Sequence, residues 1–302
     1  MSVSTTTPTP APATARPADD TPPAGAVVVG TDGSECALQA VRWATEEAAR
    51  RGAPLRIVHA TRHLPRSGVA GASPPELPRA RGITAHAYTV ARHTDASVPT
   101  STQGVPGDPV TALVRAAQDA DLLVLGIATT GAADEMVLAS VAQRVAARSP
   151  RPVVVVPRRR PGPGGSRPHV VVLGLGDRGD DEPVARFAAE QARRAGRPLL
   201  VVHSRPDAGS DWTADAGAWR ERHPDLQLSH QTLPGVTGGR VLAAACPTPL
   251  LTLSAGHGGL LYRPLDGLHR WLLRHCTSPM AFVPPVFRRT GLEPRSEIYA
   301  VG

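Results

Sequence analysis

Two stretches of the chain repeat one pattern. The same order of residues occurs in "AVVVGTDGSECALQAVRWATEEAARRGAPLRIVHATR" (26–62) and in "VVVLGLGDRGDDEPVARFAAEQARRAGRPLLVVHSRP" (170–206). Each begins with a β-branched run and a Gly/Asp turn, continues through an Ala-rich stretch to Arg-Arg and a glycine, and ends an apolar run in histidine. Such internal similarity indicates a structural unit that the chain carries twice.

The Ala-rich stretches have the pattern of amphipathic helices. Their apolar residues recur at helical spacing, as Val41, Ala44 and Ala48 in the first copy and Val184, Ala188 and Ala192 in the second. This spacing predicts one apolar face against a sheet. Gly52 and Gly196 follow at the position that a helix C-cap favours.

The later parts of the two copies also match. "GVPGDPVTALVRAAQDADLLVLG" (104–126) aligns with "GVTGGRVLAAACPTPLLTLS" (235–254), and "RSPRPVVVVP" (148–157) aligns with "CTSPMAFVP" (276–284). Continuous apolar strands that alternate with helices predict an α/β fold with a parallel sheet covered on both faces.

Composition divides the chain into five segments. We expect a disordered, Pro/Thr/Ala-rich N-terminal tail at 1–25, a first domain at 26–157, a Pro/Gly/Arg linker at 158–168, a second domain at 169–284 and a C-terminal tail at 285–302. The N-terminal segment lacks the hydrophobic core of a signal peptide.

The 302-residue chain has a net charge of +7, and all 33 of its basic residues are arginine. The absence of lysine and asparagine, whose codons are A/T-rich, suggests a GC-rich bacterium. It also excludes a Walker-type phosphate lysine, a pyridoxal Schiff base and a kinase lysine. Much of the basic charge lies in the linker, which favours a solvated surface over nucleic-acid binding.

Cysteine usage and hydropathy favour a cytoplasmic location. Cys36, Cys246 and Cys276 share no CxxC spacing, so we expect reduced thiols rather than a disulfide framework. No apolar stretch is long enough to span a membrane. The histidines show no HExxH or Cys/His ligand spacing, so a metal site is not expected.

The openings and ends quoted above resemble the universal stress protein family, closely over 26–157 and more faintly over 169–284. The resemblance implies two tandem adenine-nucleotide-binding-like (Rossmann-like) domains, each with five parallel strands. Members form dimers or pseudo-dimers, and only some bind ATP. It further implies that the last strand of each copy, "PVVVVP" and "MAFVP", can pair across an intramolecular pseudo-dimer, while a homodimer or another protein partner stays open.

The family's nucleotide site can be carried over only in part. Its nucleoside aspartate matches Asp32, and the residue whose backbone contacts adenine matches Ala60. The phosphate signature is Gly, two residues, Gly, nine residues, Gly, then Ser or Thr. Here its positions read Gly126, Thr129, Ala139 and Ser140, with Gly131 out of register.

The loss of two glycines weakens an expected phosphate site. Glycine lets backbone N–H groups approach phosphate oxygens and adopt positive φ. A helix that begins near Ala132 offers its N-terminus to an anion, but Asp134 and Glu135 lie in its first turn and repel a triphosphate. We therefore expect a partly degraded ATP site in the first domain.

The second copy departs further from the family pattern. Gly176, beside Asp177, replaces the aspartate, and the signature positions read Ser254, His257, Gly267 and Leu268. We expect a degenerate domain that is kept for pairing with the first.

Two other motifs have ordinary interpretations beside their functional ones. "GLGDRG" (174–179) is a G-x-G-x-x-G run, and Ser204 and Arg205 at the next strand end suit a 2′-phosphate, which is an NADP-type pattern. The first copy lacks that motif at the same place, which favours coincidence. Cys36 at a helix start is either a redox sensor or a small helix residue near the surface. We interpret His59 and His203, which end equivalent strands, as structural.

The leading hypothesis is a tandem, non-enzymatic stress-response protein that acts by partner binding or nucleotide sensing. The first alternative is a genuine ATP-binding member that uses Asp32, Ala60, Gly126, Gly131 and Ser140, with weak or no hydrolysis. The second is an NADP-dependent oxidoreductase.

Overall fold

The computed structural model describes residues 25–61, 76–127, 133–158, 170–174, 182–204, 220–221, 223–233, 237–255, 265 and 267–285. The expected tails and linker lie almost entirely outside these residues, and so do Thr129, Gly131, Gly176, Asp177 and His257.

The elements follow one another as the two sequence copies predict. The first half contains β1 (Ala26–Gly30), α1 (Glu35–Arg51), β2 (Leu55–Thr61), α2 (Glu76–Thr94), β3 (Thr100–Pro106), α3 (Pro109–Ala117), β4 (Ala120–Ile127), α4 (Ala133–Arg148) and β5 (Val153–Pro157). The second contains β6 (Val170–Gly174), α5 (Glu182–Ala195), β7 (Leu199–Ser204), β8 (Leu228–Leu233), α7 (Gly238–Ala245), β9 (Leu251–Ser254), α8 (Gly267–His275) and β10 (Met280–Val283).

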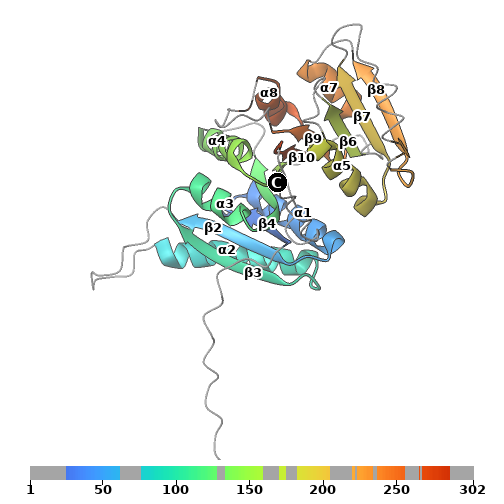
Figure 1. Ribbon diagram of the computed structural model, residues 1–302. Coiled ribbons are helices and arrows are strands. Elements are labelled where there is room, and N and C mark those ends of the chain that lie inside the picture. Colours follow the sequence, from blue (N-terminus) through green and yellow to red (C-terminus); the bar gives the residue numbers. More distant parts are fainter. Residues whose placement is uncertain are drawn as a thin grey trace, which may run out of the picture.

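The described strands form one ten-stranded sheet in the order β3-β2-β1-β4-β5-β10-β9-β6-β7-β8 (Figure 1). Within each half the strands run parallel. The halves join where β5 and β10 pair antiparallel, with Val154 opposite Ala281. The α/β fold is confirmed, and the last strands of the two copies pair as expected.

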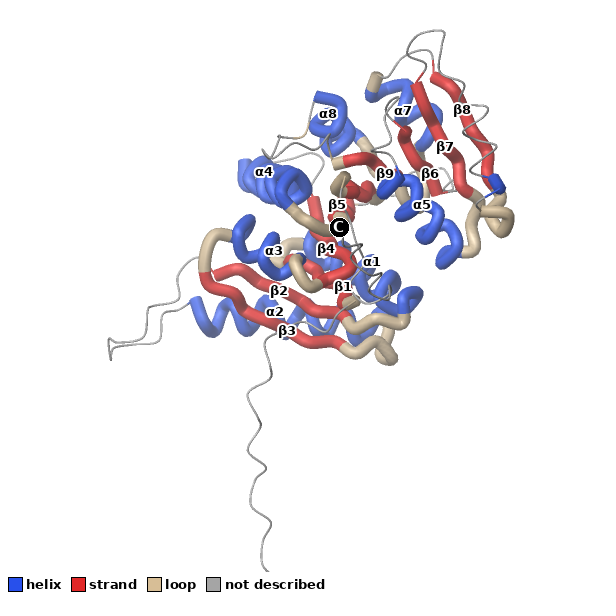
Figure 2. The backbone as a smooth tube through the Cα atoms, viewed as in Figure 1, coloured by secondary structure: helices blue, strands red, loops and turns tan. Residues whose placement is uncertain are grey.

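Helices cover both faces of this sheet (Figure 2). On one face α1, α2 and α5 pack on residues such as Val27, Val29 and Val154. On the other, α3, α4, α7 and α8 pack on residues such as Val28 and Val155. Successive strand residues therefore enter opposite cores, which explains why inner strands such as β1 and β5 are apolar throughout.

The helix faces and caps agree with the sequence. The six apolar residues predicted to face the sheet from α1 and α5 are at most 2% exposed. Ser34 caps α1 through its Oγ, which accepts the N–H of Ala37 at 3.2 Å. Gly52 and Gly196 have φ of 60° and 59°, the left-handed conformation of a C-cap.

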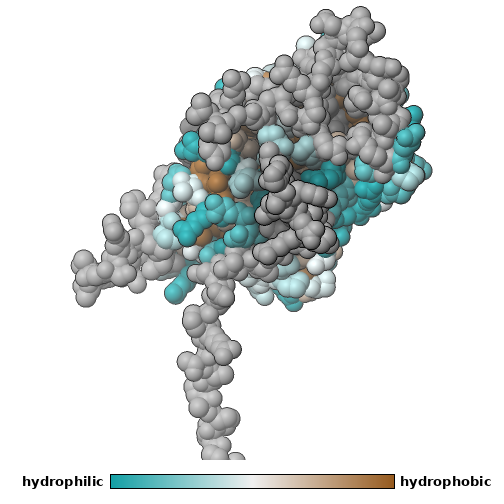
Figure 3. Space-filling model, viewed as in Figure 1, coloured by the Kyte–Doolittle hydropathy of each residue, from teal (hydrophilic) through white to brown (hydrophobic). Residues whose placement is uncertain are grey.

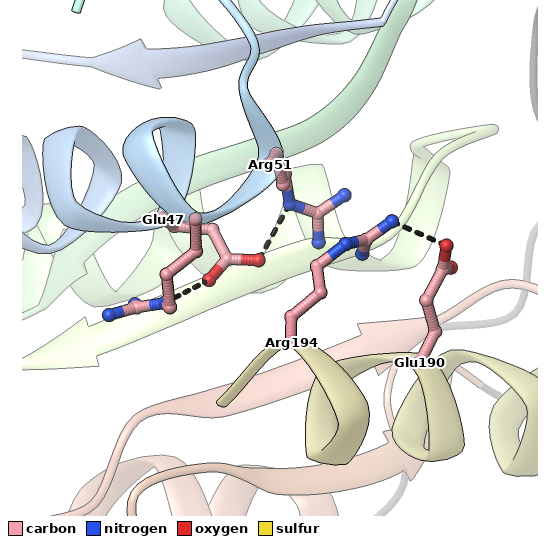
Figure 4. A network of polar contacts seen from close by, with 5 residues as sticks. Glu47, Arg51, Glu190 and Arg194 are labelled. Atoms are coloured by element: carbon pink, nitrogen blue, oxygen red, sulfur yellow. Dashed lines mark hydrogen bonds and ion pairs between the residues drawn. The ribbon is translucent and has the colours of Figure 1, made fainter. Parts of the chain in front are cut away.

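Charged side chains lie where α1 and α5 of the two halves contact each other. Glu47 accepts from Arg51 Nε at 2.6 Å and from Arg50 Nε at 3.0 Å. Figure 4 shows Arg51 and Arg194 extending toward one another, with Arg194 paired to Glu190 on its own helix. Because the Glu47 side chain is 2% exposed and that of Arg51 is 6% exposed, this pair is buried.

Helices long and apolar enough to cross a membrane are absent from the part of the chain that the structure describes. On the face shown in Figure 3, the described surface is mainly hydrophilic, with a small apolar area near α3 and α4.

Candidate functional site

The strand order creates a crevice in the first half. The chain leaves β1 toward β2 and β3 on one side, whereas β4 and β5 lie on the other. Connections that diverge at such a switch point leave a ligand site at the carboxyl ends of the strands. A cavity of ≈ 220 Å³ lies there, and its described lining residues are Gly30, Thr31, Asp32, Ser34, Ala37, Val58, His59, Ala60, Pro109, Leu113, Leu125, Gly126, Val141 and Ala142.

The loop after β1 places Asp32 at this cavity. Asp32 is exposed, and its carboxylate accepts the N–H of Ser34 at 2.9 Å. Gly33 between them has a φ of +85°, which a side chain rarely adopts. This Asx turn leads directly into the Ser34 cap of α1, so the helix start fixes the position of the aspartate.

The end of β2 forms the neighbouring wall. His59 Nδ1 lies 2.7 Å from the carbonyl oxygen of Thr31. A carbonyl only accepts, so Nδ1 carries the proton and donates it. This bond ties β2 to the loop that carries Asp32, in agreement with a structural role for His59. Ala60 is half-buried and lines the cavity beside it.

Gly126 has a packing role that the sequence did not reveal. A Cβ at this position would lie 2.3 Å from the carbonyl oxygen of Cys36 and 2.7 Å from the nitrogen of Ala37. The first turn of α1 therefore rests on the backbone of β4, and only glycine permits that approach. The presence of Gly126 follows from this packing and does not by itself indicate phosphate binding.

The same contact corrects the expectation for Cys36. Cys36 is 5% exposed, so the expected position near the surface is wrong. The apolar face of α1 turns Cys36 inward, where a thiol behaves as a small hydrophobic group.

The part of the cavity that holds the expected phosphate signature is only partly described. Ala139 and Ser140 belong to α4, but their side chains lie outside the described residues. Val141 and Ala142, the next two residues of α4, line the cavity, so α4 forms one of its walls. Because α4 begins at Ala133, Asp134 and Glu135 lie in its first turn, as expected.

A third wall comes from α3, which sequence reasoning did not assign to the site. Asp108 caps this helix, and its Oδ2 accepts the N–H of Thr111 at 3.0 Å. That hydrogen bond lowers the pKa of the Asp108 carboxyl. Pro109 and Leu113 of α3 line the cavity. The Asp-Pro pair of "GDPV" marks a helix start and was the signal available in the sequence.

The cavity offers few groups for chemistry. Among its described lining residues, only Asp32 and His59 are titratable, and each is hydrogen-bonded to backbone. Clusters of three or more metal-binding side chains are absent from the described residues. The arrangement suits a small ligand that has an apolar body and a few polar groups.

In the second half, less of the equivalent region is described. Ser254 ends β9 and is buried, while Gly267 and Leu268 open α8. Residues 175–179 of "GLGDRG" lie outside the described part of the chain, and so do Arg205 and the side chains of His203 and Ser204.

Comparison with known proteins identifies relatives for both halves. Residues 24–157 match the model of the universal stress protein family. A universal stress protein of Mycobacterium tuberculosis is 30% identical over 218 residues, covering 69% of this chain and 78% of the relative. Another from that organism is 26% identical over 297 residues, covering 84% and 95%.

The solved structure of a universal stress protein from Archaeoglobus fulgidus has a TM-score of 0.66 at 14% identity. The match covers 87% of this chain and 97% of that one. It shows that the two chains share a fold.

Proposed function

The chain belongs to the universal stress protein family, and on that premise we propose that it is a non-enzymatic stress-response protein that senses an adenine nucleoside or nucleotide. The ligand binds in the cavity between β1 and β4 of the first half. The second half is a degenerate domain of the same type, paired with the first inside one chain.

The cavity at the switch point is the observation that carries this proposal. Its walls include Val58, Leu113, Leu125 and Val141, which suit the faces of a base. Asp32 lies at the same cavity with its carboxylate exposed, where it can accept hydrogen bonds from ribose hydroxyls. The nucleoside part of a ligand therefore fits the residues present.

The phosphate part fits less well. Gly126 is accounted for by the packing of α1, and Asp134 and Glu135 bring negative charge to the helix terminus that phosphates would approach. We therefore propose that the nucleoside provides most of the binding free energy. The scarcity of titratable groups among the described lining residues supports sensing rather than hydrolysis.

A pair of aspartate variants tests the proposal. Asp32 and Asp95 each accept the N–H of the serine two residues later, at 2.9 Å and 2.8 Å; Asp32 is exposed and Asp95 is half-buried. Asp95 lies in the connection before β3, away from the cavity lining. Asp95→Ala therefore removes a similar turn without touching the site and is a matched control for Asp32→Ala.

The measurement is thermal unfolding of the full chain with adenosine, AMP, ATP or NADPH. At about 100 times Kd, a ligand adds roughly 2.7 kcal/mol to the free energy of unfolding, which is several degrees in Tm. Adenosine and AMP should stabilise the unmodified chain and Asp95→Ala, but not Asp32→Ala. If adenosine, AMP and ATP all leave Tm unchanged, the proposal is contradicted. A rise in Tm with NADPH alone supports the NADP-dependent oxidoreductase. Steady release of phosphate from ATP contradicts the non-enzymatic assignment.

A further inference from the structure

Two thiols of the second half are in contact. Cys246 Sγ and Cys276 Sγ lie 3.3 Å apart, although the residues are 30 positions apart in sequence. Neither is in a disulfide. Cys246 ends α7, where its N–H donates to the carbonyl of Leu242, and Cys276 follows α8, where its N–H donates to the carbonyl of Leu272. The sulfur atoms thus meet at the carboxyl ends of two neighbouring helices.

The surrounding backbone holds these helix ends together. The N–H of Thr248 donates to Ser278 Oγ at 2.9 Å, which links the connection into β9 with the connection into β10. Cys276 Sγ also lies 3.6 Å from the carbonyl oxygen of Ser278, which can accept its S–H. Both connections are fixed by these contacts, so the thiol pair is held in place before any reaction.

The two cysteines differ in exposure. Cys246 is half-buried, whereas Cys276 is fully buried. Cys246 is therefore the sulfur that solvent reaches more readily. The hydrogen bond with Cys246, together with burial, raises the pKa of the Cys276 thiol. The exposure of Cys246 suits it as the attacking thiol, and the contact with Cys246 suits Cys276 as the resolving thiol.

We propose that Cys246 and Cys276 form a reversible intramolecular disulfide when the protein meets a peroxide. The Cys246 thiolate attacks one peroxide oxygen, the O–O bond breaks, and sulfenic acid forms. The hydroxide that leaves takes up the proton released by the Cys246 thiol and becomes water. The Cys276 sulfur then attacks the Cys246 sulfur; the S–S bond forms, the S–O bond breaks, and a second water leaves with the remaining thiol proton. With hydrogen peroxide, two thiols and one peroxide become one disulfide and two waters.

The geometry requires a small movement. The sulfur atoms must approach from 3.3 Å to the disulfide length of about 2.05 Å, which rotation about the side-chain bonds can provide. The bond closes a loop that contains β9 and α8 and ends just before β10. Since β10 pairs with β5 of the other half, the disulfide reinforces the chain next to the junction.

The test is peroxide treatment of the purified full chain, followed by peptide mass spectrometry without reduction. We expect a cross-linked peptide pair containing Cys246 and Cys276, with loss of two hydrogen atoms, which dithiothreitol reverses. Cys36, buried in α1, is the internal control and should stay a thiol. Oxidation should raise Tm by about 5–10 °C, because the closed loop restricts the unfolded chain.

Variants assign the effect to the pair. Cys246→Ser and Cys276→Ser should each abolish the cross-link and the rise in Tm, whereas Cys36→Ser should retain both. Sulfinic acid on Cys246 without a cross-link, a disulfide between two chains, or thiols that survive peroxide sufficient to oxidise Cys36 would each overturn the proposal. The cross-link is read directly on the unmodified chain, so a variant that fails to fold leaves the test intact.

Discussion

At the scale of single residues, the site depends on close backbone approaches. The backbone at Gly126 meets Cys36 and Ala37 so closely that even one methyl group has no room. Replacing this glycine therefore moves α1 away from β4 or strains both.

Gly126→Ala should lower the free energy of unfolding by about 1–3 kcal/mol or more, because the added Cβ overlaps backbone that cannot rotate away. The control is Gly104→Ala in β3, where a Cβ meets nothing within 4 Å, and a change within about 0.5 kcal/mol is expected. Urea denaturation measures both. Equal midpoints for the two variants would mean that α1 does not rest on β4 as described.

Glu47 provides a second prediction at this scale. Glu47→Gln replaces the carboxylate that pairs with Arg50 and the buried Arg51 by a neutral amide. It should lower the free energy of unfolding by about 3–5 kcal/mol. Its neighbour Glu46 has a 57% exposed side chain, 4.0 Å from Arg50, so Glu46→Gln should cost less than about 1 kcal/mol. Denaturant titration of the pair checks this. A Glu47 variant no less stable than the Glu46 variant contradicts a buried ion pair.

At the scale of elements, the start of α3 links helix capping to the cavity. Asp108→Ala should cost about 1 kcal/mol, because the N–H of Thr111 loses its acceptor. Asp108→Asn should keep most of the stability at neutral pH, since asparagine also caps helices.

The Asp108 cap also has a predicted pH dependence. The pKa of its carboxyl is lower in the folded state than the ordinary value of 3.8. The stabilisation is therefore fully present above pH 3.8 and is lost as pH falls through the lowered pKa. The stability difference between the unmodified chain and Asp108→Asn should shrink over that acidic range. A difference that grows on acidification contradicts the assignment.

The features that could be predicted from the sequence are those that residues close together in the sequence determine. The C-caps at Gly52 and Gly196 and the buried helix faces follow from spacing within single helices. Sequence reasoning did not predict the packing role of Gly126, the burial of Cys36 or the contact between Cys246 and Cys276. Each of these depends on residues from separate elements, whose approach is fixed by tertiary packing rather than by a local pattern.

At the scale of the whole molecule, the junction between the two halves, where β5 pairs with β10, lies at the centre of one continuous sheet. β5 and β10 have neighbours on both sides and buried residues on both faces, whereas β3 and β8 form the edges. Hydrogen exchange should therefore be slowest in β4, β5 and β10 and fastest, among described strands, in β3 and β8. Exchange in β5 and β10 as fast as in the edge strands would show that the halves separate readily.

The internal similarity of the two halves contrasts with their different sites. The sheet and helix packing recur in both, while two of the four phosphate-signature positions are replaced in the first half and three in the second. We therefore propose that the first half retains a nucleoside cavity and has a weakened phosphate-binding site beside it.

The affinity of adenosine relative to ATP, measured by calorimetry on the full chain, tests that assignment most directly. A phosphate-binding site that donates several charge-assisted hydrogen bonds would bind ATP roughly 100-fold more tightly than adenosine, or about 2.8 kcal/mol. We predict Kd values for adenosine and ATP that differ by less than about tenfold. ATP bound 100-fold more tightly than adenosine would contradict it.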